Sequence, residues 1–271
     1  MENEQLEQLL TQALSSSVEP SETLNKKIKD RIKEDVTMKT VHKKMVVAFI
    51  AAVIIVMSGS VFAAWQLLSP KQVAEELGDK TLAEAFSGEN AVNINESVAS
   101  GDYIFTLLGI TSGKNLSDFG DPEQNIQPDR TYAVVSIARK DGTPIPELND
   151  ESYNEPSFIV SPLIKGQKPW QVNIATMNGG YIERVVNGVI YRIIECDSIE
   201  MFADRGVYLY VGIGAFINNQ TVSYDEDTGE ITLNENNKEA GALFDLPLDV
   251  KKADHEKAEE YLQQLLNPKS E

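Results

Sequence analysis

The sequence predicts a mainly β protein, in which an antiparallel β-sandwich domain with a C-terminal helix follows one transmembrane helix and a short N-terminal helical arm. Three observations predict this arrangement. Residues 45–70 contain no charged side chain. From Ala91 onward, short runs of β-branched and aromatic residues alternate with turn residues, which is typical of antiparallel strands. Near the end, apolar residues recur at helical spacing and stop before Pro268.

The composition allows a packed domain and argues against nucleic acid as a partner. The chain has 271 residues, of which 42% are hydrophobic, and a formal net charge of −18. Residues 1–44 carry 8 basic and 8 acidic side chains, whereas residues 66–271 carry 16 basic and 34 acidic ones. All of the negative excess therefore follows the apolar run. Because this charge would repel phosphate groups, we expect no nucleic acid partner.

These patterns divide the chain into six parts. In order, they are a cytoplasmic amphipathic helical arm (1–44), a transmembrane helix (45–66), a juxtamembrane helical connector (67–90), an extracytoplasmic β-sandwich domain (91–252), a closing helix (253–267) and a tail (268–271). We expect the protein to cross the cell membrane once, with its N-terminus in the cytoplasm and its C-terminal domain outside.

The uncharged run has the length of a membrane span. A helix of about 20 residues rises about 30 Å, which matches the hydrocarbon core of a bilayer. Residues 26–44 hold 8 basic and 3 acidic side chains, and the positive-inside rule puts such a flank in the cytoplasm. A cleaved signal peptide ending at VFAA (61–64) and a buried helix of a soluble protein are the alternatives. The long region before the run disfavours the first, and the length of the run disfavours the second.

The arm contains two short amphipathic helical patterns. The residues that we expect to bind a partner share the apolar face of each pattern and are Leu6, Leu9, Leu10, Leu24, Ile28 and Ile32. Two helices of this size bury little by themselves, so their apolar faces indicate a cytoplasmic protein partner. Alternatively, the helices pair with each other or lie on the anionic inner leaflet of the lipid bilayer. With one cysteine and two histidines, the chain cannot assemble a zinc cluster, and we expect no metal or cofactor.

Two short helices and a series of strands are predicted after the span. Ser69-Pro70 begins the first helix, which ends at Gly78, and the second helix ends near Gly88. The candidate strands are 92–98, 102–111, 131–139, 157–163, 170–177, 181–186, 189–196, 207–216, 221–226 and 230–234. Asn187-Gly188 predicts the clearest hairpin, because both residues tolerate positive φ angles. Short strands with such turns favour an antiparallel sandwich over a parallel sheet.

The sequence contains no set of residues typical of catalysis, and we expect the protein not to be an enzyme. Cys196 is predicted to be a small buried hydrophobe, and His255 a solvated surface residue. The segment DEDTGE (225–230) is rich in oxygen ligands but lacks the spacing of a calcium loop. We interpret it as a hairpin turn closed by Gly229. No residue is therefore assigned as catalytic, cofactor-binding or metal-binding.

Five stretches of the outer part carry a family resemblance, namely GDYIFTLLGITSGKNLSDF (101–119), DRTYAVVSIARKDGTPIPE (129–147), SPLIKGQKPWQVNIATMNGG (161–180), IYRIIECDSIEMFADRGVYLYV (190–211) and SYDEDTGEI (223–231). With the arm and the span, they resemble the single-pass, anti-sigma-factor-like membrane proteins of Gram-positive bacteria. The resemblance covers nearly the whole chain from about residue 20. It implies an extracytoplasmic immunoglobulin-like domain of unassigned function. It also implies an arm that holds an extracytoplasmic-function sigma factor until an outside signal arrives, although this chain lacks the His and Cys ligands of zinc-containing anti-sigma modules.

Two function classes follow from these features. In the first, the protein is a membrane-anchored regulator whose arm holds a cytoplasmic sigma factor and whose outer domain responds to an unknown extracytoplasmic ligand. In the second, it is a cell-surface binding module in which the arm only anchors the chain and has no transcriptional role. An extracytoplasmic hydrolase is disfavoured, because the sequence offers no nucleophile, base and metal set.

Overall fold

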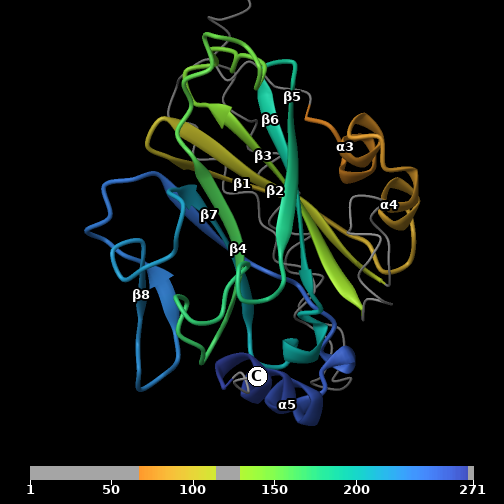
Figure 1. Ribbon diagram of the computed structural model, residues 1–271, viewed down its shortest axis with the longest axis vertical. Helices are drawn as coiled ribbons and strands as arrows, with labels where there is room; N and C mark the ends of the chain where they lie inside the picture. The colour runs from red at the N-terminus through yellow and green to blue at the C-terminus, as the bar shows by residue number, and fades with distance from the viewer. Residues whose placement is uncertain (1–66, 114–128, 268–271) are drawn as a thin grey trace, which may run out of the picture. The chain divides into compact units, whose positions relative to one another are not determined.

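The computed structural model describes residues 67–113 and 129–267, which all belong to one compact unit. The predicted arm (1–44), the predicted span (45–66) and the predicted tail (268–271) lie outside the described residues. Within the described part, no helix is long and apolar enough to cross a membrane. The described residues form a mainly β structure with antiparallel sheets and a C-terminal helix, as the sequence predicts (Figure 1).

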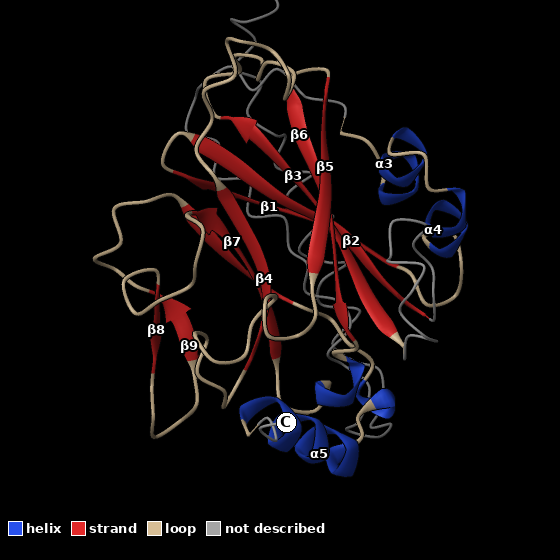
Figure 2. Ribbon diagram, in the orientation of Figure 1, coloured by secondary structure: helices blue, strands red, loops and turns tan. Residues whose placement is uncertain are grey.

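The elements are drawn by type in Figure 2. The helices are α3 (Pro70–Glu76), α4 (Lys80–Ala85) and α5 (His255–Leu266), with 3-10 turns η2 (Glu200–Phe202) and η3 (Val250–Lys252). The strands are β1 (Val92–Ser100), β2 (Tyr103–Gly113), β3 (Arg130–Arg139), β4 (Phe158–Ile164), β5 (Gly180–Val186), β6 (Val189–Asp197), β7 (Val207–Ile213), β8 (Val222–Tyr224), β9 (Ile231–Leu233) and β10 (Gly241–Asp245).

Two antiparallel sheets share the main core. Sheet A has the strand order β1-β2-β3-β6-β5, sheet B has the order β10-β7-β4, and β8 and β9 form a separate hairpin. The buried side chains that sheet A turns toward the core include Phe105, Leu107, Val135 and Ile194. Those of sheet B include Val160, Leu209, Val211 and Phe244. The predicted closing helix is α5, and it joins this core through Ala258 and Leu262.

The predicted hairpin at Asn187-Gly188 is confirmed. It joins β5 to β6, with Val186 opposite Val189. Asn187 has a φ of 52° and Gly188 a φ of 79°, which are the positive angles that a two-residue turn between antiparallel strands requires. A Cβ at Gly188 would lie 2.7 Å from Cβ of Pro144, so tertiary packing also demands glycine there.

The predicted strand at 170–177 is wrong. This segment is a series of turns, in which Val172 N donates to Lys168 O at 3.0 Å and Met177 N donates to Asn173 O at 2.9 Å. Val172 and Met177 are both buried in the main core. The pattern therefore correctly indicated that apolar side chains of this segment are buried. They are buried by a series of turns and not by an extended strand.

One strand was not predicted. β10 pairs antiparallel with β7, with Ala242 opposite Val211. Its sequence, GALFD, begins with glycine and ends with aspartate, so it carries little intrinsic preference for a strand. The other predicted strands each overlap an observed one.

Candidate functional site

The arm residues predicted to bind a partner, Leu6, Leu9, Leu10, Leu24, Ile28 and Ile32, lie outside the described residues. Within the described part of the chain, the candidate site is the junction where the connector helices α3 and α4 meet sheet A. This choice follows from position, because residue 67 comes directly after the predicted span. Any mechanical link between the two-sheet domain and that span has to run through this junction.

The connector helices are short, and side-chain caps define where they begin. Ser69 Oγ accepts from Gln72 N at 3.3 Å, and Gln72 Oε1 accepts from Ser69 N at 2.9 Å, which makes a complete capping box. Asp79 Oδ1 accepts from Leu82 N at 2.8 Å at the start of α4. Helices of 7 and 6 residues are not stable alone in water, so both depend on docking to the sheet.

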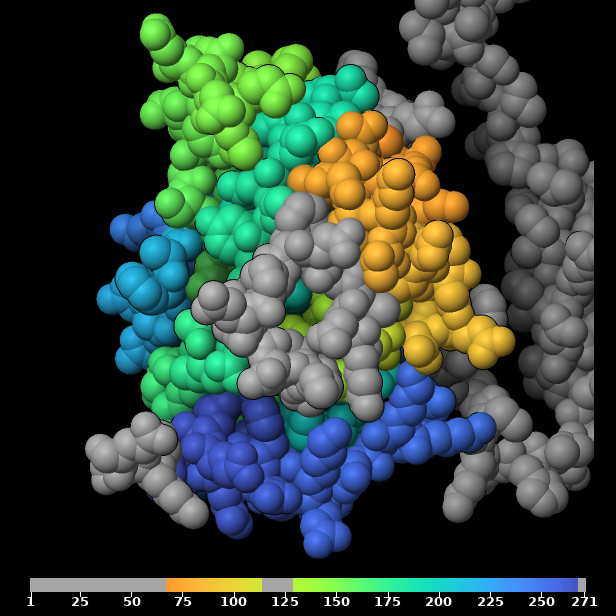
Figure 3. Space-filling view, turned by 45° about the vertical axis from the view of Figure 1, so that its right-hand side comes forward, coloured from red at the N-terminus to blue at the C-terminus, as the bar shows by residue number. Residues whose placement is uncertain are grey.

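Apolar packing docks the connector on the outer face of sheet A. The connector contributes the buried side chains of Val73, Ala74, Leu77, Leu82, Ala83 and Phe86. The sheet contributes Leu108, Tyr132, Val134, Ala138, Val189, Tyr191 and Ile193. Figure 3 shows the connector, coloured orange to yellow, lying against the domain. The connector therefore forms a third layer over sheet A rather than a free linker within the described part.

Gly109 permits the close approach of α3 to β2. A Cβ at this position would lie 3.0 Å from Cγ of Pro70 and 2.7 Å from the carbonyl oxygen of Val92. Gly109 also lies at a shift in the register between β2 and β3. A larger residue here would push the beginning of α3, or strand β1, away from β2.

Two polar contacts fix the connector at its first residues and at the end of α3. Leu68 N donates to the hydroxyl of Tyr191 at 3.1 Å. Arg184 Nη1 donates to the carbonyl oxygen of Glu76 at 2.6 Å, where a helix end leaves carbonyl groups without partners in the helix. Burial raises the pKa of Tyr191, and the bond from Leu68 opposes this rise. The phenol therefore stays neutral at physiological pH.

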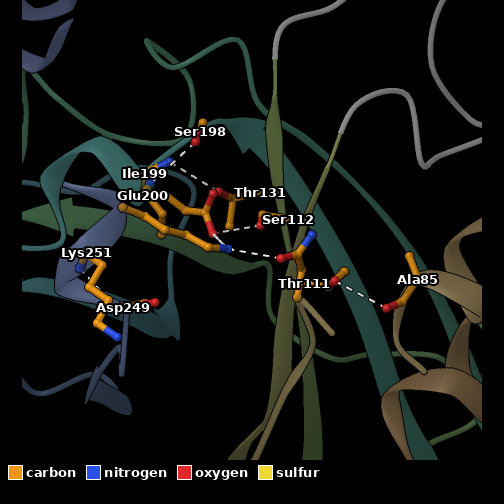
Figure 4. A network of polar contacts seen from close by, with 11 residues as sticks. Ala85, Thr111, Ser112, Thr131, Ser198, Ile199, Glu200, Asp249 and Lys251 are labelled. Atoms are coloured by element: carbon orange, nitrogen blue, oxygen red, sulfur yellow. Dashed lines mark hydrogen bonds and ion pairs between the residues drawn. The ribbon is translucent and has the colours of Figure 1, made fainter. Parts of the chain in front are cut away.

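Two consecutive residues at the end of β2 contact the connector and the C-terminal elements, respectively (Figure 4). Thr111 Oγ1 donates to the carbonyl oxygen of Ala85, the last residue of α4, at 3.4 Å. Ser112 Oγ donates to Glu200 Oε1 of η2 at 2.8 Å. Because successive side chains of a strand point to opposite faces, this strand end holds one element on each side.

Lys252 in η3 completes the network. Its ammonium group contacts Glu200 Oε1 at 2.6 Å and donates to Asn90 Oδ1 at 3.1 Å. Asn90 follows α4 and precedes β1, so a single side chain joins η3, η2 and the end of the connector. The side chain of Lys252 is 37% exposed and that of Glu200 is 24% exposed. Such a partly exposed pair contributes modestly, about 0.2–1 kcal/mol.

A buried network anchors α5 to sheet A. Asp197, at the end of β6, accepts from Arg130 at 3.1 Å, from the amide of Asn178 at 2.8 Å and from the hydroxyl of Tyr261 at 2.9 Å. Burial and the charge of Asp197 raise the pKa of Tyr261, so its phenol stays protonated and donates. The Arg130 and Asp197 side chains are 7% and 9% exposed. Removing one partner of such an ion pair leaves the other as an unpaired buried charge, which strongly destabilises the fold.

The residues singled out for chemistry from the sequence lie apart from this junction. Cys196 is buried, and burial raises the pKa of its thiol to about 12, so it is not a reactive thiolate at neutral pH. His255 is exposed at the start of α5, with Nδ1 3.3 Å from Arg205 Nη2. The segment 225–230 forms the turn of the hairpin between β8 and β9, with Gly229 at a φ of 70°. Among residues 67–113 and 129–267, no three His, Cys, Asp or Glu side chains converge to hold a metal ion.

Comparisons with known proteins found no match to any family model, to any curated protein or to any solved structure.

Sequence reasoning did not single out the polar residues of the junction. Ser112, Glu200, Lys252 and Asn90 come from four separate parts of the chain, and no local pattern marks them. A signal for the junction itself was present, however. Strands β3 and β6 are apolar on both faces, with almost every residue buried, and a strand of this kind has to be covered on its outer face as well.

Proposed function

We propose that the protein is a membrane-anchored regulator, in which residues 1–44 hold a cytoplasmic sigma factor and the two-sheet domain responds to an extracytoplasmic signal. The observation that carries the proposal is the docking of the connector. Leu68, two residues after the predicted span, bonds to Tyr191 on β6, an interior strand of sheet A. A conformational change in sheet A would therefore displace the first residues that follow the proposed span. A freely jointed linker would lose that information.

We further propose that the two-sheet domain is immunoglobulin-like. Two antiparallel sheets around a common core support this assignment, as does the family resemblance of the outer part. The connector helices that cover the outer face of sheet A are an addition to that plan.

The partner of the arm can be tested with a matched pair of variants. The full chain is captured from native membranes after mild solubilisation, and co-purified proteins are identified by mass spectrometry. We expect a sigma factor with the unmodified chain and its loss with Leu9→Asp, which places a charge on the apolar face. Gln8→Asp adds the same charge beside that face and should retain the partner. Recovery of no sigma factor from any of the three proteins would count against the proposal.

The alternative function is a surface binding module without a transcriptional role. The exposed Trp170 favours it, because its ring packs edge-on against Tyr224 at 6.3 Å and leaves 41% of the residue accessible, and exposed aromatic residues are common in binding surfaces. Deleting residues 1–35 separates the two functions. Altered transcription supports the regulator, whereas unchanged transcription together with unchanged surface binding supports the module.

A further inference from the structure

We propose that the C-terminal cap, formed by η2, η3 and α5, controls how firmly the connector is docked on sheet A, and that Lys252 transmits this control. Lys252 belongs to the cap and reaches Asn90 at the end of the connector. The proposal concerns the described domain alone and does not depend on what the arm binds. It identifies a conformational device rather than a ligand site.

The cap is built to move as one unit. Asp254, which caps α5, donates its backbone N–H to the carbonyl oxygen of Met201 in η2 at 3.1 Å. The rings of Phe202 and Tyr261 pack at 6.1 Å between centroids. Arg205 pairs with Glu259 at 2.7 Å. A displacement of α5 therefore displaces η2 and, with it, the carboxylate of Glu200.

The cap reaches the connector by two routes. The direct route is the hydrogen bond from Lys252 to Asn90. The indirect route runs from Glu200 to Ser112 and, through the adjacent residue Thr111, to the end of α4. Because Lys252 also pairs with Glu200, removal of its charge weakens both routes at once.

The connector is the part that should respond. Its two helices are too short to persist without docking, so they open locally more readily than the buried strands of sheet A. Removing a partly exposed ion pair changes such an opening equilibrium by about two- to fivefold. An effect of this size leaves the main core folded and alters only the population of undocked connector.

Hydrogen exchange of the full chain in detergent or nanodiscs tests this inference. Lys252→Met keeps most of the unbranched side chain and removes the charged ammonium group. We expect amide exchange over residues 73–86 to become about two- to fivefold faster, with no change over residues 130–139. Lys251→Met is the matched control, because the Lys251 side chain forms no ion pair within the described residues. It should leave the connector unchanged.

Reciprocity provides a second measurement. Coupling between two sites acts equally in both directions, so loosening the connector with Leu82→Ala should speed exchange over residues 255–266. In a Lys252→Met background, the same substitution should speed this exchange clearly less. This test compares the two backgrounds, so a general loss of stability from Leu82→Ala does not obscure it.

Three results would overturn the proposal. One is faster exchange over residues 255–266 alone in Lys252→Met, with residues 73–86 unaffected. Another is an equally large increase in exchange over residues 73–86 in Lys251→Met, which would mean that the loss of a positive charge, and not the Lys252 contacts, causes the increase. If Lys252→Met lowers the melting temperature of the whole domain, Asn90→Ala provides the decisive variant, because it cuts only the direct route. In that case, unchanged amide exchange over residues 73–86 in Asn90→Ala is the third result that would overturn the proposal. Failure to recover a sigma factor leaves this inference standing.

Discussion

The two sheets are covered on their outer faces in different ways. Sheet A carries the connector helices, and sheet B carries the β8–β9 hairpin with the segment before it. Each cover lies over a buried tyrosine of an interior strand, Tyr191 in β6 and Tyr210 in β7. Tyr191 accepts a hydrogen bond from Leu68 of its cover. The hydroxyl of Tyr210 is buried without a hydrogen-bond partner of normal geometry in the described residues.

The surroundings of Tyr210 explain this difference. Its hydroxyl lies against Gly212 and Gly241, and a Cβ at Gly212 would collide with it. The nearby hydroxyl of Thr221 lowers the pKa of Tyr210, against the larger rise from burial, and it donates its own proton to Asn218 O at 2.9 Å. Both covers are held by packing and by polar contacts, since Tyr208 of β7 donates to Glu230 of the sheet B cover at 2.8 Å. The difference between them lies in the buried tyrosine, whose hydroxyl bonds to the cover of sheet A but not to that of sheet B.

The largest effect is expected in the apolar part of the sheet A cover. Leu82 in α4 is 0% exposed, and Leu82→Ala should lower the free energy of unfolding by about 3 kcal/mol, because it leaves a cavity between α4 and the sheet. Urea denaturation measures this change. Lys80→Ala, at an exposed position of the same helix, is the control and should change stability by less than about 0.5 kcal/mol. Similar losses in both variants would show that α4 is not docked as described.

A smaller effect is expected from the tyrosine that bonds to the connector. Tyr191→Phe removes the acceptor of Leu68 N–H and keeps the ring. We expect a loss of about 1 kcal/mol in the free energy of unfolding, together with faster exchange of the Leu68 amide. A stability equal to that of the unmodified protein would mean that the contact does not position the connector.

The matched substitution on the other sheet should have the opposite sign or no effect. Tyr210→Phe removes a buried hydroxyl that lacks a partner, so we expect unchanged stability or a gain of about 1 kcal/mol. The same denaturation experiment measures it beside Tyr191→Phe. A clear loss of stability in Tyr210→Phe would indicate that its hydroxyl is hydrogen-bonded, and it would remove the contrast between the two tyrosines.

The smallest expected effect is a change in how the free energy of unfolding depends on pH in the alkaline range. Burial raises the pKa of Tyr210 to about 12, whereas tyrosine in an unfolded chain has a pKa of about 10. Below pH 10 both states keep the proton, so the contribution to stability is complete. Between about pH 10 and 12 only the unfolded state loses the proton, and stability therefore falls as pH rises.

Tyr210→Phe removes one source of this decline. The loss of stability between pH 10 and 12 should be shallower in the variant, as measured by urea denaturation at a series of pH values. It will not disappear, because the pKa of Tyr208 is also raised to about 12 by burial and by its bond to Glu230. An identical slope in the two proteins would show that Tyr210 ionises as readily in the folded state as in the unfolded one.

Local features of the fold were predictable where a few adjacent residues contain the cause. The capping box at Ser69, the helix end at Gly78 and the hairpin at Asn187 each depend on backbone angles or hydrogen bonds within a few positions. The segment 170–177 was misassigned because alternating burial does not distinguish a strand from a series of buried turns. β10 escaped prediction because its pairing partner β7, not its own sequence, makes it a strand.

The sequence by itself determined the mainly β character, the two connector helices and the closing helix, because periodicity and turn residues act over short distances. Only the tertiary structure decided that the connector is this cover, that Lys252 lies between the cap and Asn90, and that Tyr210 lacks the partner that Tyr191 has. The reason is physical, since contacts between side chains remote in sequence depend on how whole faces pack, and no local preference encodes them.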